Sequence, residues 1–221
     1  MKLLVENIEH IEYLNEEING KKSLYITGPF LVGEQVNKNG RLYPIGLLER
    51  EVGNYIKECI EGCNSWGELN HPEKPTVNLD RACIMVKELK REGNNFIGKA
   101  KVLEHLPMGA IAKGLIDEGG KLGVSSRGVG SLKEDEKGYK VVQDDFKLCV
   151  AADVVASPSG PGAFVQGIME NVEWIYDPVQ GTWVEERVHE MKKEVHKMTR
   201  EQREANLLRI FEELIRDIAR L

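Results

Sequence analysis

Residues 122–131 read Leu-Gly-Val-Ser-Ser-Arg-Gly-Val-Gly-Ser, and this stretch is the most informative part of the chain. The pattern predicts a short apolar strand over 122–125 that ends in two serines, followed by an arginine and spaced glycines. A serine at the end of a strand can be exposed beside backbone N–H groups, which an acyl-transfer nucleophile requires. Because side chains alternate across a strand, only one of Ser125 and Ser126 can face a site.

A general base for such a serine is available in the motif Gly67-Glu68-Leu69-Asn70-His71-Pro72. An imidazole titrates near neutral pH and is the natural base there. His71 is the histidine that lies in a polar loop between predicted core elements; the others fall in the acidic lead-in, in a loop before a helix and on the charged tail (His10, His105, His189, His196). The alternative reading of His71 is an ordinary hydrogen-bonded loop residue.

A third member would orient the histidine, and three carboxylates are candidates. Asp153 lies inside the apolar run Ala151–Val155, where a buried carboxylate needs a partner. Glu68 is the competing orienter, and Asp80 is a weaker one. Arg127 can hold developing negative charge directly, brace its loop, or form a structural ion pair.

Composition narrows the class of protein. The chain has 221 residues and a net charge of −6, and no region has the basic excess of a nucleic-acid binder. No apolar run approaches the roughly 18 residues of a membrane span, and the N-terminus becomes acidic too soon for a signal peptide. Cys59, Cys63 and His71 form only part of a zinc-like ligand set, so we expect neither a metal nor another cofactor.

The pattern of elements predicts a mixed α/β but mainly β fold. Many short strands surround two predicted helices, over 45–59 and 107–118. This order favours a β-barrel or open barrel flanked by helices over a Rossmann fold. We expect a first strand and a loose lead-in over 1–22, a principal domain over 23–170, and a hairpin and amphipathic helical tail over 171–221. The tail either docks on the domain or binds a partner helix.

Four motifs in this order resemble the prohead (capsid maturation) serine proteases of large tailed bacteriophages, which are similar in fold to the herpesvirus assemblins. They are Asn37–Pro44, Gly67–Pro72, Gly123–Gly128 and Asp153–Val155 with Ser157-Pro158-Ser159, within a match over about 23–165. The resemblance assigns the base to His71 and the nucleophile to Ser125. It leaves Arg127, Ser126 and Gly128 in supporting or oxyanion roles. The herpesvirus enzymes use a second histidine as third member; this chain has none there, and Asp153 takes that place, with Glu68 as the alternative.

The resemblance also implies a function. Such an enzyme cleaves scaffold or core proteins, the major capsid protein precursor and itself, inside the procapsid in the host cytoplasm or in a prophage-encoded equivalent. No nucleic-acid or membrane partner is expected, and a homo-oligomer is left open. Relatives prefer cleavage after Leu/Ile-x-Glu, so Ile168-Met169-Glu170 is a candidate self-cleavage site. The alternative is an inactive capsid assembly or scaffold-binding protein of the same fold.

Overall fold

The structure is a computed structural model that describes residues 1–8, 11–18, 21–156, 173–178 and 181–186. The chain divides into two compact units, Met1–Phe164 and Val165–Leu221. The domain boundary expected at residue 170, the self-cleavage site at Glu170 and the helical tail beyond residue 186 all lie outside the described residues. No helix in the described part is long and apolar enough to cross a membrane.

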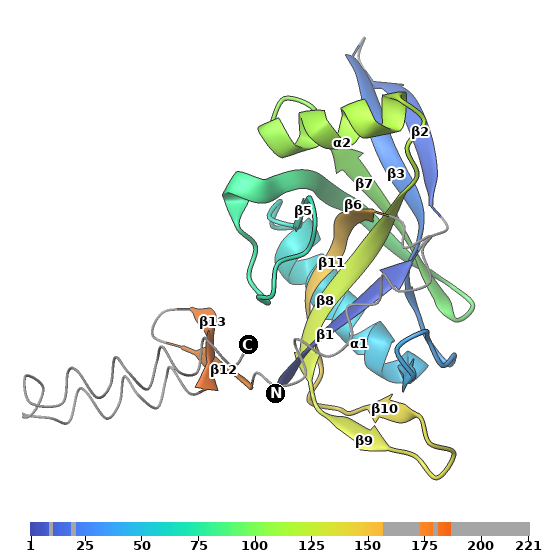
Figure 1. The fold of residues 1–221 in the computed structure, drawn as a ribbon, viewed down its shortest axis with the longest axis vertical. Coiled ribbons are helices and arrows are strands. Elements are labelled where there is room, and N and C mark those ends of the chain that lie inside the picture. The colour runs from blue at the N-terminus through green and yellow to red at the C-terminus, as the bar shows by residue number, and fades with distance from the viewer. Residues whose placement is uncertain (9–10, 19–20, 157–172, 179–180, 187–221) are drawn as a thin grey trace, which may run out of the picture. The chain divides into compact units, whose positions relative to one another are not determined.

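The first unit is mainly β, as expected, with few helices (Figure 1). Its largest sheet is antiparallel and has the order β2-β3-β7-β6-β5. These strands span Glu12–Ile18 (β2), Lys21–Val32 (β3), Trp66–Glu68 (β5), Ala82–Glu92 (β6) and Asn95–Val102 (β7).

A second sheet carries the Ser-Ser-Arg motif. Its strands are β1 (Lys2–Ile8), β8 (Leu122–Gly130) and β11 (Lys147–Ala156), in the order β1-β8-β11. A small sheet joins β4 (Arg41–Leu42), β9 (Leu132–Glu134) and β10 (Lys140–Val142). Among the described strands no sheet closes into the expected barrel.

Both predicted helices are present. The first is α1 (Ile45–Tyr55), which continues into a π-helical turn at Ile56–Ile60, and the second is α2 (Pro107–Asp117). The apolar stripe of α1 is buried as its periodicity predicts, because its side chains pack into one core with those of both large sheets (Leu47, Leu48, Val52, Tyr55; Ile26, Phe30, Val86, Val124, Val154).

The strand β8 is longer than its sequence suggests. We expected a short strand over 122–125 that ends at the serines, but one strand runs from Leu122 to Gly130 and every residue in it is buried. The glycines that resemble turn signals instead allow close packing. A Cβ on Gly128 would lie 2.4 Å from the Phe146 ring, so only glycine lets that ring rest on the strand.

The segment 1–22, expected as a first strand and a loose lead-in, carries two strands, and both belong to the first compact unit. β1 pairs antiparallel with β8, and β2 pairs antiparallel with β3. Glu6 anchors β1, since its carboxylate accepts hydrogen bonds from Arg41 Nη1 (3.0 Å), Tyr43 Oη (2.9 Å) and Asn39 Nδ2 (2.7 Å). The motif over 37–44 therefore holds β1 in place beside β8.

The described part of the second unit is a hairpin of β12 (Trp174–Asp177) and β13 (Thr182–Glu185). This confirms the hairpin expected within 171–221. Tyr176 and Trp183 face each other across it with ring centroids 5.5 Å apart.

Candidate active site

The two serines of β8 point to opposite faces of their sheet. Ser125 lies opposite Asp153 of β11, and it shares its face with Arg127 two residues on. Ser126 shares the other face with Val124 and Gly128, where the core and Phe146 pack. Both serines lie within the strand and are buried, with 1% and 7% of their surfaces exposed, so the expectation of an exposed serine at a strand end is wrong.

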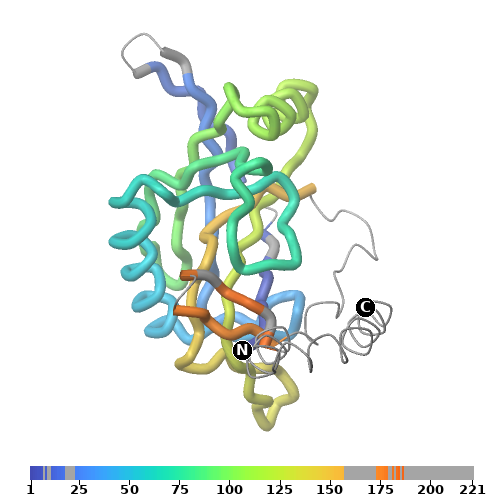
Figure 2. Tube along the Cα trace, turned by 90° about the vertical axis from the view of Figure 1, so that its left-hand side faces the viewer, coloured from blue at the N-terminus to red at the C-terminus, as the bar shows by residue number. Residues whose placement is uncertain are grey.

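His71 is brought to this sheet by the segment that follows β5. Leu69 bridges Val154 of β11, and the Asn70 N–H donates to the Val154 carbonyl at 2.8 Å. β11 therefore lies between the strand of Ser125 and the start of the loop that carries His71. Figure 2 shows this loop, in teal, passing in front of β8 and β11.

The environment of His71 favours its neutral form. Burial lowers the pKa of this imidazole below its ordinary value of 6.5, and the positive charge of Arg127 lowers it further, against smaller raising effects of Glu68 and Glu73. A neutral imidazole is the state that can accept a proton. Its Nδ1 atom is buried and has no hydrogen-bond partner among the described residues.

Asp153 pairs with Arg127 in the interior beside Ser125. Arg127 Nε lies 2.6 Å from Asp153 Oδ2, and Nη2 lies 3.1 Å from Oδ1, which is a bidentate pair between two fully buried side chains. Burial raises the pKa of Asp153, and the neighbouring guanidinium opposes that change. A β-bulge in β11 between Val150 and Asp153 sits at this point of the ladder, and such bulges are common beside active sites.

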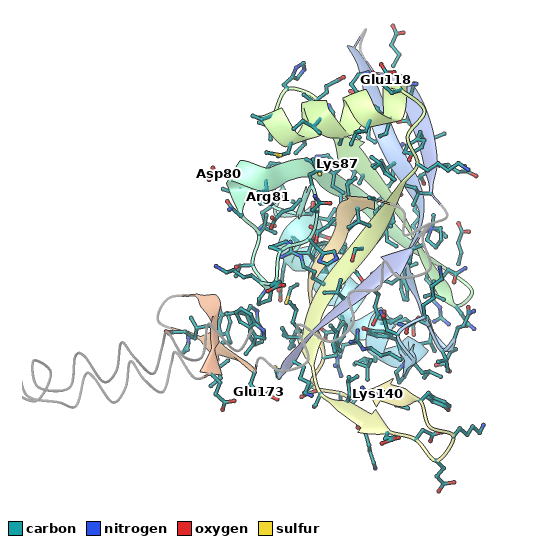
Figure 3. All side chains as sticks on the ribbon, viewed as in Figure 1. Asp80, Arg81, Lys87, Glu118, Lys140 and Glu173 are labelled. Carbon is teal, nitrogen blue, oxygen red and sulfur yellow. The ribbon has the colours of Figure 1, made fainter. Side chains whose placement is uncertain are left out.

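Glu68 joins the same network. Its Oε1 accepts from Arg127 Nη2 at 3.1 Å and from the Asn78 N–H at 2.9 Å. Its backbone N–H donates to Asp153 Oδ1 at 2.8 Å, and Arg81 Nε lies 3.5 Å from its Oε2. Arg81 and the exposed Asp80 lie on the short 3₁₀ helix Leu79–Arg81 that ends the loop (Figure 3).

The structure thus gathers Ser125, Arg127, Asp153 and Glu68 beside the loop of His71. In the described part of the chain, Ser125 Oγ has no hydrogen-bond partner, so no hydrogen bond joins the candidate nucleophile to the candidate base. Asp153 Oδ1 accepts from Arg127 and from the Glu68 N–H, and Oδ2 accepts from Arg127. Among the hydrogen bonds of the described residues, none links Asp153 to His71. Hydrogen bonds between catalytic groups commonly tighten only with bound substrate. The assignment of the third member stays a prediction.

Sequence reasoning did not find two partners of Arg127, the backbone carbonyls of Lys74 and Thr76. Every residue has a carbonyl, so no side-chain pattern marks these two. The available signal was an arginine within an apolar strand, which must find acceptors when buried.

The cysteines of the weaker metal hypothesis lie on and after the π-helical turn. Cys59 is half-buried and Cys63 is exposed, with a positive φ of 56°. Within the described ranges, no group of three or more His, Cys, Asp or Glu side chains is placed to hold a metal ion.

Comparison with known proteins decides the family. The sequence profile of the prohead core protein serine proteases matches residues 4–173. This chain belongs to that family. The prohead core protein protease of Enterobacteria phage T4 is 41% identical over 152 residues, which cover 68% of this chain and 71% of that protein. The solved structure of the bacteriophage T4 capsid assembly protease matches with a TM-score of 0.68 and 39% identity, over 71% of this chain and 98% of that one.

Membership confirms the resemblance on which the sequence analysis relied. It establishes a capsid maturation protease family, whose name gives the serine type. The family match begins at residue 4, inside β1, which agrees with β1 being an integral strand.

Proposed function

We propose that this prohead-family protein is a serine endopeptidase that cleaves scaffold or core proteins, the major capsid protein precursor and itself inside the procapsid. One observation carries the proposal: Ser125 lies on the face of β8 that holds a buried Arg127–Asp153–Glu68 network, one strand away from the loop of His71. The names of the family and of its T4 relative support the substrate class.

The proposed chemistry begins at Ser125. Its Oγ attacks the scissile carbonyl carbon while neutral His71 takes the hydroxyl proton. His71 then gives that proton to the leaving amine as the peptide C–N bond breaks, and water hydrolyses the acyl-enzyme in the reverse sense. The lowered pKa of His71 keeps the base unprotonated at neutral pH.

Asp153 is the proposed third member, and Glu68 remains its alternative. The carboxylate lies directly opposite Ser125 in the sheet, which supports a role in the site. We also propose that the fold is related to that of the herpesvirus assemblins, since the mainly β unit and the spacing of the motifs support that relation. A homo-oligomer remains part of the proposal to be tested by solution mass.

Substitution of the two serines tests the assignment. Ser125→Ala and His71→Ala should each lower cleavage of a scaffold substrate by about 10⁴-fold or more, because each removes a member of the catalytic unit. Ser126→Ala is the matched control, because it removes the same hydroxyl from the opposite face. The measurement is the rate of fragment formation by purified protein on denaturing gels.

Loss of cleavage in Ser126→Ala with retention in Ser125→Ala would overturn the choice of nucleophile. Retention in both variants would show that neither serine is the nucleophile. Absence of cleavage by the wild-type protein would favour the alternative function, an inactive scaffold-binding protein, which should still bind scaffold without cutting it.

A further inference from the structure

Arg127 is completely buried, and each of its five N–H donors has an acceptor. Nε donates to Asp153 Oδ2. Nη2 donates to Asp153 Oδ1 and to Glu68 Oε1, both at 3.1 Å. Nη1 donates to the carbonyl oxygens of Lys74 and of Thr76, the latter at 3.1 Å. No donor of this side chain remains for a substrate oxyanion in this arrangement.

The acceptors belong to three separate segments. Asp153 lies on β11, Glu68 ends β5, and the two carbonyls lie three and five residues after His71. Arg127 itself lies on β8, two residues after Ser125. One side chain therefore connects the strand of the proposed nucleophile to the loop of the proposed base.

The loop from Leu69 to Arg81 is also closed at its base. The Leu69 N–H donates to the Arg81 carbonyl at 3.1 Å, and Arg81 Nη2 donates to the Leu69 carbonyl at 2.6 Å. The Asn78 N–H donates to Glu68 Oε1 at 2.9 Å. The loop is thus tied near its ends by Leu69, Asn70, Asn78 and Arg81. Between Asn70 and Asn78, the hydrogen bonds of the described residues attach it to the sheets only through Arg127.

The charges in this cluster balance, with two cations, Arg127 and Arg81, against two carboxylates, Glu68 and Asp153. A buried carboxylate is tolerated only when it is paired and hydrogen-bonded, so loss of Arg127 leaves two of them undercompensated. Lysine cannot replace it, because a point-charge ammonium has three donors and lacks the planar fork that reaches all five acceptors.

We propose that Arg127 is a positioning residue that fixes the 69–81 loop, and with it His71, against the strand of Ser125, and that it does not donate directly to the oxyanion. Asp153 and Glu68 act on the site through Arg127 by holding its guanidinium in place. The part of this inference that concerns His71 as a base rests on the proposed function, whereas the anchoring of the loop does not.

Hydrogen exchange in the Ser125→Ala background tests the anchoring without requiring activity. Arg127→Lys should speed exchange of the Asn78 and Glu68 amides by about tenfold or more, since their acceptors lose the group that holds them. Amides in the centre of the β6–β7 pair should keep their rates. Arg91→Lys is the matched control, since it makes the same change at a half-exposed arginine of the β6–β7 hairpin and should leave the loop amides unchanged.

Kinetics in the Ser125-containing enzyme complete the test. We expect Arg127→Lys to lower kcat much more than it changes KM, in a protein whose Asn78 and Glu68 amides exchange hydrogen faster. Lost kcat with unchanged exchange at Asn78 and Glu68 would overturn the proposal and make Arg127 an oxyanion donor. Wild-type kcat would overturn it as well.

If Arg127→Lys does not fold, Glu68→Gln tests the same network, because the amide keeps an acceptor for Asn78 but loses the charge that holds Arg127. Glu68→Gln should also speed hydrogen exchange of the loop amides and lower kcat. An unchanged exchange rate together with an unchanged kcat would overturn the proposal. Failure of the proposed function is separate, because it would appear as full cleavage by Ser125→Ala whatever the exchange rates are.

Discussion

At the residue scale, the proposed proton transfer depends on His71, whose imidazole is partly buried near one arginine and two glutamates. Burial and Arg127 both disfavour the imidazolium, and Glu68 and Glu73 favour it less strongly. The direction of the resulting pKa shift therefore follows first from burial of the imidazole, and second from the same guanidinium that joins the loop to β8.

This environment predicts the pH dependence of cleavage. Only neutral His71 can accept the proton of Ser125, so kcat/KM should fall as the pH drops through the pKa of His71. Because that pKa is lowered, the midpoint of the acid limb should lie below 6.5. Rates on a peptide substrate between about pH 4.5 and 8 measure it, since the ordinary histidine value lies within that range.

An acid limb centred above 6.5 would contradict this environment for His71. Exposed His105 offers a control, because His105→Gln should leave the pH profile unchanged.

The sequence identified Ser125, His71 and Asp153 as candidates because each is a chemically distinctive side chain in an unusual place. It left Arg127 open between an oxyanion donor and a brace. The choice depends on five acceptors, two of them backbone carbonyls, and these are known only once the loop is placed in space.

At the scale of elements, the site depends on how closely β5 approaches β11. A Cβ on Gly67 would lie 2.0 Å from the Ala152 carbonyl oxygen and 2.8 Å from Ile84 Cγ1. Because one obstacle is backbone, it cannot move aside by a change of rotamer. Gly67 therefore allows β5 to lie against β11 and deliver the loop of His71 to it.

Gly67→Ala should accordingly destabilise the protein by about 1–3 kcal/mol, as overpacking generally does, and slow cleavage. Denaturant unfolding monitored by circular dichroism measures the first effect. Gly53→Ala is the control: a Cβ there meets nothing within 4 Å on helix α1, and alanine should be neutral or stabilise by up to about 1 kcal/mol. Equal stability of Gly67→Ala and wild type would show that β5 can shift without cost.

Periodicity predicted both helices, because an amphipathic stripe depends only on local spacing. It did not predict the length of β8, because the glycines that pack under Phe146 look like a turn signal in the sequence. A first strand was expected within the acidic segment 1–22, but its pairing with β8 was not, because that partner lies far along the chain.

At the scale of the whole molecule, the chain forms two compact units, with the second beginning at Val165. The segment Ile168-Met169-Glu170 follows that boundary and lies outside the described residues. If the protein cuts itself after Glu170, its catalytic unit is separated from the rest of the chain.

We expect mass spectrometry of matured wild-type protein to show a species that ends at Glu170, and Ser125→Ala to remain intact. A Glu170→Gln variant should also remain uncut there, because it removes the acidic residue that the family resemblance requires before the cleaved bond. The tail remaining on mature wild-type protein, or its equal loss from Ser125→Ala, would contradict self-cleavage at this site.

The sequence by itself determined the mainly β class, both helices, the candidate residues and the family, because these rest on local periodicity and on motifs of distinctive side chains. The tertiary structure decided which serine faces Asp153, that both serines are buried, and that Arg127 connects β8 to the loop of His71. Those features depend on strand register and on contacts between residues far apart in the chain, and the free energy of burying charge is set only when the partners meet.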